Sequence, residues 1–287
     1  MKIAFLGTGL MGAPMAERLA KNGFIVYAFN RTAAKAKHLE NSGVKIFEQA
    51  DMAMYDCDVI ITMVSDYKAV NAILFSDFSF SFKGKTVIQM STISPEQNLQ
   101  VKKEIEAGGG SFIEAPVLGG VAQAQSGELI VMVGSSLEQF QNFKKIFSVI
   151  GNNVQLIGEV GKASAIKLAY NQLIGTMNAA FCMSLGYIKD KGINQTTFME
   201  ILRTSTLYAP AFDKKLDNYS NRDYDKTNFS VKLLLKDMNL AIDEFEKSGI
   251  DCLTVKGVKF LLERAIYFEL GEKDYSAMYD VIAPSKE

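Results

Sequence analysis

The sequence is short of the residues that build disulfide frameworks and zinc sites. Its 287 residues include one histidine, His38, and three cysteines, none in C-x-x-C spacing. Cys57, Cys182 and Cys252 lie in apolar or helical stretches, which predicts neither a disulfide scaffold nor a Cys/His zinc site. We therefore expect no metal and a reducing, cytoplasmic environment.

An excess of one charge and long apolar runs are also missing. The 31 basic and 32 acidic residues nearly balance, so there is no electrostatic basis for nucleic acid or an anionic membrane surface as the main partner. No apolar stretch reaches about 18 residues, and the glycine-rich start "MKIAFLGTGLMG" has no signal-peptide cleavage pattern. The expected partner is a small molecule, with neither nucleic acid nor membrane.

Before residue 160, short apolar runs alternate with helix-like segments. The runs are "KIAFL", "FIVYAF", "DVIITMV", "KTVIQM", "SFIEA", "LIVMVG" and "NVQLIG". Continuous apolar runs of this length are typical of parallel strands covered on both faces and joined by right-handed βαβ crossovers. The sequence therefore predicts an α/β fold with a doubly wound parallel sheet over residues 1–160.

After residue 160 the pattern becomes helical. Apolar periodicity recurs through 162–190, 195–204, 231–248 and 254–269, and no convincing strand appears. We predict an all-helical domain over residues 161–287 for substrate binding and oligomerisation, starting with a long interdomain helix.

Three glycines stand between the first strand and the first helix. Gly7, Gly9 and Gly12 form G-x-G-x-x-G, with Leu10 and Met11 between the last two. Such glycines permit a tight turn and close approach of the backbone to a pyrophosphate, which the helix N-terminus also attracts. Because the motif lies in a strand–turn–helix context, we predict a Rossmann-type dinucleotide site rather than an ordinary glycine turn.

The end of the second strand predicts the kind of dinucleotide. Where NAD enzymes usually present an acid to the ribose, this chain has Asn30, Arg31 and Thr32. Arginine attracts a 2′-phosphate that a carboxylate would repel, and the other two side chains can add hydrogen bonds. We predict NADP(H) in preference to NAD(H); the alternative is that Arg31 is merely solvated at the start of the next helix.

Smaller cofactor contacts are expected at two further strand ends. Val64 and Ser65 end the fourth strand and are expected near the adenosine ribose and pyrophosphate, while Thr92 follows the next strand on the nicotinamide side. The alternative is that these residues cap the following helices, as Ser94 before Pro95 is expected to do.

Four separated blocks of the chain resemble the β-hydroxyacid dehydrogenase family. They are "FLGTGLMGAPMAERLAKNGFIVYAFNRT", "EAPVLGGVAQAQSGEL", "GEVGKASAIKLAYNQ" and "LLLKDMNLA", in the family's order. The family includes 3-hydroxyisobutyrate dehydrogenases, tartronate semialdehyde reductases and glyoxylate or succinic semialdehyde reductases. The resemblance implies a small carboxylic acid substrate and a homodimer or homotetramer.

The third block contains two polar groups in a helix that is otherwise small and apolar. A strip at helical spacing comprises Ala163, Ser164, Lys167, Asn171 and Gly175. The resemblance implies that Lys167 is the catalytic acid/base and that Asn171 orients the substrate. From the residues alone, the alternative is a lysine that reaches solvent beside a surface asparagine.

When hydride adds to a carbonyl carbon, negative charge develops on the oxygen. The ammonium of Lys167 can stabilise this charge and then protonate the oxygen. The reverse reaction needs the neutral amine, whose pKa burial or a nearby positive charge would lower. The resemblance places Lys236 beside the cofactor, near its nicotinamide end; the alternative is an ordinary Lys–Asp pair on a solvated helix face.

The second block forms the expected substrate loop. Gly119 and Gly120 stand at its bend, where bare backbone N–H groups can approach an anion closely. The resemblance implies that this loop holds the substrate carboxylate. The family pattern is "PVSGG" or "PVSGS", and Leu118 replaces the serine. A hydroxyl donor is thereby lost and apolar bulk gained, which makes a less polar or longer acid more plausible.

Other dehydrogenase mechanisms do not fit the sequence. His38 lies in a charged segment far from any glycine loop, which argues against a histidine-based 2-hydroxyacid dehydrogenase. Tyr187 and Lys191 satisfy the Y-x-x-x-K pattern of short-chain dehydrogenases, but we interpret them as a charged helix end. We expect an NADP(H)-dependent oxidoreductase that interconverts a short aldehyde-acid or keto-acid and its hydroxy-acid, as a semialdehyde or glyoxylate-type reductase. The alternatives are a 3-hydroxyisobutyrate dehydrogenase, an imine reductase and a non-catalytic dinucleotide-binding scaffold.

Overall fold

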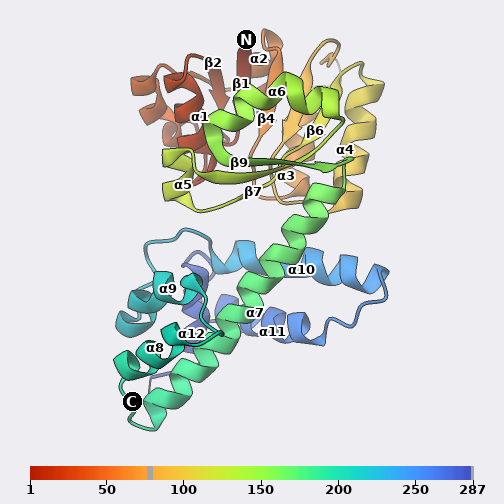
Figure 1. The fold of residues 1–287 in the computed structure, drawn as a ribbon. Coiled ribbons are helices and arrows are strands. Elements are labelled where there is room, and N and C mark those ends of the chain that lie inside the picture. The colour runs from red at the N-terminus through yellow and green to blue at the C-terminus, as the bar shows by residue number, and fades with distance from the viewer. Residues whose placement is uncertain (76–79, 286–287) are drawn as a thin grey trace. The chain divides into compact units, whose positions relative to one another are not determined.

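The computed structural model describes residues 1–75 and 80–285 (Figure 1). The chain divides into two compact units, Met1–Lys167 and Leu168–Glu287. The division falls within helix α7 (Lys162–Asp190), rather than before it at residue 160, where the sequence pattern changes. The first turns of this helix therefore belong to the first unit.

The first unit is built on a nine-stranded sheet in the order β3-β2-β1-β4-β5-β6-β8-β7, with β9 paired to β8. The strands are β1 (Lys2–Leu6), β2 (Ile25–Phe29), β3 (Lys45–Phe47), β4 (Val59–Thr62), β5 (Thr86–Gln89), β6 (Ser111–Glu114), β7 (Val117–Leu118), β8 (Leu129–Gly134) and β9 (Gly151–Gly158). From β3 to β6 all neighbours are parallel, and the chain reverses its direction of travel across the sheet between β1 and β4. The predicted doubly wound α/β fold is confirmed.

The sheet is mostly parallel, and its exceptions involve β8. β8 runs antiparallel to both β6 and β7, and parallel to β9. Between β7 and β8 there is only the short helix α5 (Val121–Ser126), and a connection of this length is too short for a full parallel crossover. The sequence pattern also missed β3 and β7, because two or three residues are too few to show a period.

Helices cover both faces of the sheet. They are α1 (Gly12–Lys21), α2 (Ala50–Tyr55), α3 (Tyr67–Leu74), α4 (Pro95–Ala107) and α6 (Leu137–Ile150), together with α5. In β1, Ile3 and Phe5 pack with α1 and α6, while Ala4 and Leu6 pack with α2, α3 and α4. Both faces of each central strand are buried, which explains why its sequence is a continuous apolar run.

The second unit consists of helices. They are the rest of α7, then α8 (Gln195–Thr204), α9 (Pro210–Asn221), α10 (Val231–Lys247), α11 (Leu253–Tyr267), a short 3-10 turn η3 (Tyr275–Ala277) and α12 (Met278–Ile282). The sequence pattern missed α9, since its polar residues read as a loop. Phe212, Leu216 and Tyr219 at positions i, i+4 and i+7 were the available signal.

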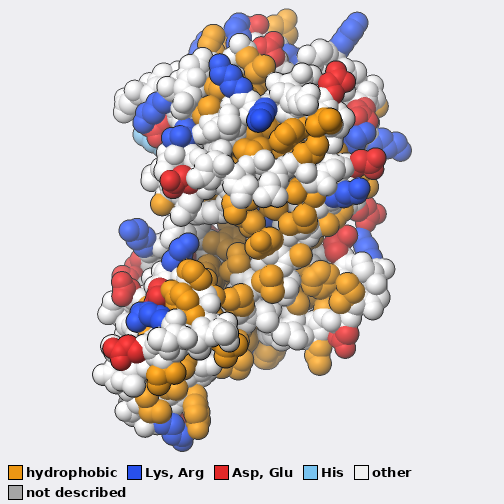
Figure 2. Space-filling view, in the orientation of Figure 1, with side chains coloured by type: hydrophobic (Ala, Val, Ile, Leu, Met, Phe, Trp, Pro, Cys, Tyr) orange, Lys and Arg blue, Asp and Glu red, His pale blue; other side chains and the backbone are white. Residues whose placement is uncertain are grey.

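The helical unit has a buried ion pair and an apolar exterior. Lys215 Nζ donates to Asp274 Oδ1 at 2.7 Å, and both side chains are buried. Apolar side chains also gather on the outside of this unit (Figure 2). Leu253 and Tyr267, both in this unit, are 74% and 82% exposed. In the part of the chain that the structure describes, no helix has the length and apolarity to cross a bilayer.

Candidate functional site

The glycine turn after β1 has the geometry of an anion site. A Cβ on Gly12 would lie 1.9 Å from the carbonyl oxygen of Gly7, and Gly7 itself has φ of +100°. A Cβ on Gly9, in contrast, would meet no atom within 4 Å. Gly7 and Gly12 are thus required by the fold, while Gly9 leaves open space in front of the backbone.

The start of α1 completes this site. Met11 is the N-cap residue and makes no side-chain hydrogen bond to the helix, and the first turn has no acidic residue. Leu10 is exposed, and the buried Oγ1 of Thr8 has no hydrogen-bond partner among the described residues. Helix N–H groups left without a cap attract a phosphate, so the residues present fit a bound dinucleotide.

Of the three residues predicted after β2, Asn30 is hydrogen bonded to the glycine turn, and Arg31 and Thr32 are exposed. Asn30 Oδ1 accepts a hydrogen bond from the backbone N–H of Thr8 at 3.3 Å, and Asn30 Nδ2 donates to the carbonyl of Thr32 at 2.9 Å. The Asn30 amide therefore shapes the glycine turn. Arg31 and Thr32 are exposed beside it, ahead of two 3-10 turns (Ala33–Lys35 and Lys37–Ser42) rather than the predicted α-helix.

A buried polar network joins the ends of β4 and β5. The backbone N–H of Val64 donates to Ser91 Oγ at 2.8 Å, and the N–H of Ser91 donates to Gln89 Oε1. Gln89 Nε2 in turn donates to Asn98 Oδ1 at 2.8 Å. Sequence reasoning missed Ser91, although it directly precedes Thr92; the network holds the two strand-end loops at which we expect the cofactor.

Helix caps account for two of the hydroxyl groups near these loops. Ser65 Oγ donates to Asp66 Oδ2 at 2.8 Å, and Asp66 is the N-cap of α3. Ser94 forms a capping box with Gln97 at the start of α4, directly before Pro95, so its expected capping role is confirmed. Ser65 is therefore hydrogen bonded to the residue that caps α3, and its contact with the cofactor stays a prediction.

The predicted substrate loop runs from β6 through β7 to α5. Gly119 has φ of +134°, and a Cβ there would lie 2.7 Å from a methyl group of Leu129. The backbone N–H of Gly120 donates to Gln123 Oε1 at 2.9 Å, so it is already hydrogen bonded and not bare as we expected. Leu118 pairs with Ile130 in the sheet and is partly exposed.

Lys167 lies at this loop. Its Nζ donates to the carbonyl oxygen of Val117 at 2.8 Å, and its side chain is half-buried. The start of α7 is held nearby, because Glu114 Oε1 accepts from the N–H groups of Gly161 at 2.7 Å and Ala163 at 2.8 Å. The structure therefore brings Lys167 together with the loop on which Leu118, Gly119 and Gly120 stand.

In the helical unit, Asn171 belongs to a buried polar cluster. Asn171 Nδ2 donates to Asp237 Oδ2 at 2.5 Å, and Lys236 Nζ lies 2.8 Å from Asp237 Oδ1. Asn171 and Asp237 are only 1% and 2% exposed, so neither the solvated asparagine nor the solvated Lys–Asp pair describes this cluster. Sequence reasoning missed Asp237. The available signal was Asn171 itself, because an asparagine in an apolar helix needs a polar partner from elsewhere in the chain.

The Asp237 carboxylate sets the orientation of the Asn171 amide. A carboxylate only accepts, so the Asn171 nitrogen must face it and the amide oxygen must point elsewhere. That oxygen, Oδ1, is buried and has no hydrogen-bond partner in residues 1–75 and 80–285.

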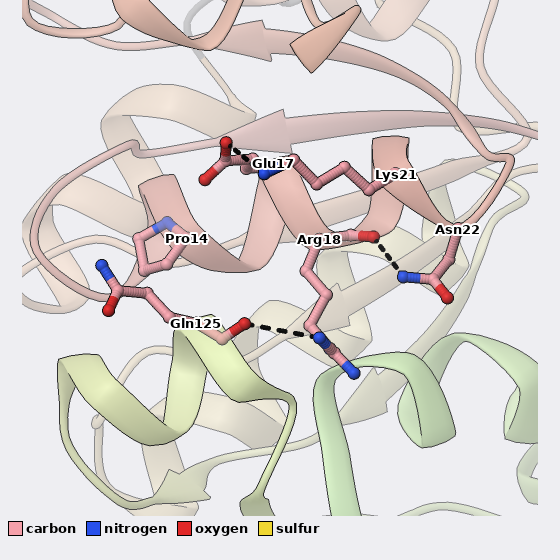
Figure 3. A pocket seen from close by; sticks show the side chains of 6 residues that line it. All are labelled: Pro14, Glu17, Arg18, Lys21, Asn22 and Gln125. Carbon is pink, nitrogen blue, oxygen red and sulfur yellow. Dashed lines mark hydrogen bonds and ion pairs between the residues drawn. The ribbon is translucent and has the colours of Figure 1, made fainter.

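A cavity of about 270 Å³ lies along α1 beyond the glycine turn (Figure 3). Its charged side chains already have partners: Lys21 pairs with Glu17 at 2.8 Å, and the Arg18 guanidinium donates to the carbonyls of Val149 and Gln125. Arg18 thus fastens α1 to α5 and α6. The charged side chains of this cavity are thus engaged by the protein itself. The described residues contain no cluster of His, Cys, Asp or Glu suited to a metal.

A sheet with a glycine turn before its first helix, followed by a helical unit, is the arrangement of a two-domain dinucleotide-binding dehydrogenase. Residues 2–158 match the family profile described as the NAD-binding domain of 6-phosphogluconate dehydrogenase. Residues 161–282 match the profile described as NAD-binding of NADP-dependent 3-hydroxyisobutyrate dehydrogenase. The chain belongs to the β-hydroxyacid dehydrogenase family, as its sequence blocks predict, and is an NAD(P)-binding oxidoreductase.

Individual relatives agree with this assignment. The chain is 30% identical to glyoxylate/succinic semialdehyde reductase 1 of Arabidopsis thaliana over all of both chains. It is 31% identical to 2-hydroxy-3-oxopropionate reductase of Escherichia coli (strain K12), over 84% of this chain and 83% of that protein. A crystal structure of 3-hydroxyisobutyrate dehydrogenase from Salmonella typhimurium has the same fold, with a TM-score of 0.89, 21% identity, and 98% and 99% of the two chains covered.

Proposed function

We propose that the protein is an NADP(H)-dependent reductase that converts a short aldehyde-acid or keto-acid to its hydroxy-acid. The observation that carries the proposal is the position of Lys167, whose Nζ is held at the Val117 carbonyl beside the loop of Gly119 and Gly120. The names of the two reductases, from Arabidopsis and Escherichia coli, support an aldehyde-acid substrate.

Because all three cysteines are buried free thiols, we also propose a reducing, cytoplasmic location.

The residues of this chain supply acid catalysis and substrate orientation. A bound reduced nicotinamide supplies the hydride that the carbonyl carbon accepts. The ammonium of Lys167 stabilises the negative charge that develops on the oxygen and then protonates it. The Val117 carbonyl holds this ammonium in place. The Asn171 amide oxygen, which has no partner among the described residues, is the acceptor that we propose for the hydroxyl group formed in the product.

A second candidate is oxidation of 3-hydroxyisobutyrate, which the profile matched by residues 161–282 favours. The two candidates separate in one experiment that follows NADPH oxidation with glyoxylate and succinic semialdehyde and NADP⁺ reduction with 3-hydroxyisobutyrate. We expect the highest kcat/KM with an aldehyde-acid. Highest efficiency with 3-hydroxyisobutyrate would assign the second function, and turnover of cyclic imines alone would contradict both.

Replacing Arg31 by alanine should weaken the use of NADPH and leave that of NADH almost unchanged. Arg31 is exposed and directly follows Asn30, which is hydrogen bonded to Thr8 in the glycine turn, and we propose that its guanidinium binds the 2′-phosphate. A charge-assisted hydrogen bond contributes about 1.5–3 kcal/mol, so kcat/KM for NADPH should fall by about 10- to 100-fold. Lys35→Ala, which removes an exposed cation from the same segment, is the control. An unchanged NADPH/NADH ratio in Arg31→Ala would show that this arginine is only solvated.

Replacing Leu118 by serine should raise kcat/KM for glyoxylate by about tenfold, since a hydroxyl donor to a carboxylate contributes about 1.5 kcal/mol or more. Leu118→Ala is the matched control, because it removes the apolar bulk without adding a donor. Steady-state kinetics with glyoxylate and a longer aldehyde-acid measure the effect. Equal gains in the two variants would mean that space, and not the missing hydroxyl, limits the reaction.

We propose that the protein is a homodimer or homotetramer joined through its helical unit. Apolar side chains gather on the outside of this unit (Figure 2), and such surface is normally covered in oligomers. Its exposed apolar residues include Tyr187, Leu253 and Tyr267. Sedimentation equilibrium should give two or four times the chain mass of 31.6 kDa. A Leu253→Glu, Tyr267→Glu double variant should sediment as a smaller species; a monomeric wild type contradicts the proposal.

A further inference from the structure

Glu114 is a fully buried carboxylate at the end of β6. Its Oε1 accepts hydrogen bonds from three backbone N–H groups at the start of α7: Gly161 at 2.7 Å, Ala163 at 2.8 Å and Ser164 at 3.4 Å. Burial raises the pKa of Glu114, and these hydrogen bonds oppose the rise because they stabilise the charged form. One side chain of the sheet thus satisfies most of the open donors of a helix that begins 48 residues later in the chain.

Five other helices, α3, α4, α6, α8 and α10, are capped by the residue that directly precedes them. Asp66, Ser94, Ser136, Asn194 and Ser230 each accept a hydrogen bond in the helix that they precede. Such a local cap satisfies a helix end without tying it to any other element. The Glu114 carboxylate does more, because it fastens α7 to the strand that leads into the substrate loop.

The neighbouring strand leaves room for this carboxylate. Gly134 in β8 is the sheet partner of Glu114, and a Cβ on Gly134 would lie 2.3 Å from Glu114 Oε1. The second oxygen, Oε2, is buried and has no hydrogen-bond partner among the described residues. A buried carboxylate oxygen left unpartnered is destabilising, so stability alone is a poor explanation for this arrangement.

The segment that begins at Glu114 also holds Lys167. Three residues after Glu114, the carbonyl of Val117 accepts from Lys167 Nζ at 2.8 Å. On the helix side, Lys167 is the sixth residue after Gly161, so the segment and the first two turns of α7 are hydrogen bonded to each other at both ends. Freeing the Glu114 end would let the helix start shift, and the Lys167 amine would move with it.

We propose that Glu114 is a positioning residue: its carboxylate fixes the first turn of α7 against β6 and thereby sets the place of the Lys167 amine at the substrate loop. This inference rests on the proposed role of Lys167 as the catalytic acid. Glu114 itself takes no part in proton transfer, because both its oxygens are enclosed and Oε1 is occupied by the helix.

The test compares Glu114→Ala, Lys167→Ala and the double variant in the full chain. We expect Glu114→Ala to lower kcat by about 100-fold, the usual effect of a misplaced catalytic group, with KM for NADPH changed less than about twofold. In the Lys167→Ala background the same substitution should lower the residual rate no further. Glu114→Gln, which keeps an acceptor oxygen, should recover most of kcat. Additive losses in the double variant, or a normal kcat in Glu114→Ala, overturn the inference.

Two further measurements keep the test decisive. If Glu114→Ala does not fold, Gly134→Ala displaces the carboxylate instead and should reproduce the loss of kcat, while Ser94→Ala controls for loss of an ordinary cap. Hydrogen exchange at residues 161–164 should accelerate in Glu114→Ala and stay unchanged in Lys167→Ala. A wild-type rate in Lys167→Ala refutes the proposed function, and the exchange rates then still decide whether Glu114 holds the helix; unchanged exchange overturns the inference.

Discussion

Replacing Lys167 by alanine will lower kcat for reduction of an aldehyde-acid by about 10²–10⁴-fold, the usual contribution of a general acid. The Lys167 ammonium lies 2.8 Å from the Val117 carbonyl, at the loop that we expect to hold the substrate carboxylate. Alanine removes both the positive charge and the proton that the developing alkoxide needs. Binding of NADPH, measured by its fluorescence, should stay within about threefold of wild type, because the glycine turn is untouched.

The control for this variant is Lys162→Ala, which removes an exposed lysine from the first turn of the same helix. It should leave kcat within about twofold, since a surface charge so placed contributes little. Equal rates for Lys167→Ala and wild type would refute acid catalysis by this residue. Absence of turnover by either protein on a broad panel of aldehyde-acids, together with tight NADPH binding, would favour the non-catalytic scaffold.

Gly12→Ala will mainly lower the stability of the protein, whereas Gly9→Ala will mainly weaken its binding of NADPH. A Cβ on Gly12 meets the Gly7 carbonyl at 1.9 Å, so Gly12→Ala should lower the free energy of unfolding by about 1–3 kcal/mol. A Cβ on Gly9 meets nothing within 4 Å, so Gly9→Ala should change stability by less than about 0.5 kcal/mol. Its methyl group would instead stand where the backbone approaches the pyrophosphate, and should weaken NADPH binding by about tenfold or more.

Urea denaturation and NADPH titration of the two variants test this separation, with each variant serving as the control for the other. Gly12→Ala should lose stability, and its cofactor affinity should fall as well, because the turn itself is displaced. Normal NADPH affinity in Gly9→Ala would mean that the cofactor does not approach this turn. Normal stability in Gly12→Ala would contradict the close contact between Gly12 and Gly7.

Most of the sheet could be predicted from the sequence because its central strands are buried on both sides. The seven predicted runs coincide with β1, β2, β4, β5, β6, β8 and β9. The antiparallel pairing of β8 could not be predicted, because it depends on which edge of the sheet the chain meets after α5. Helix α9 was missed for a related reason: its apolar residues are few and become informative only when a core is seen to receive them.

The candidate site shows a similar division. Gly7, Gly12, Lys167 and the loop around Gly119 could be proposed as site residues from the sequence, because each lies in a recognisable local pattern. Asp237, Ser91 and Glu114 were missed because their partners lie far away in the sequence, at Asn171, at Val64 and at the start of α7. The N–H of Gly120 was predicted to be bare, and the Gln123 side chain that occupies it is visible only in the folded loop.

By itself, the sequence determined the α/β and helical halves, the glycine turn and the family, because these depend on hydrophobic period, backbone sterics and motifs that are local in the chain. Only the tertiary structure decided where Lys167 lies, which way the Asn171 amide is turned, and that Glu114 holds the start of α7. Those features are hydrogen bonds between residues 47 to 66 positions apart in the sequence, and each buried polar group takes the partner that packing brings within about 3 Å.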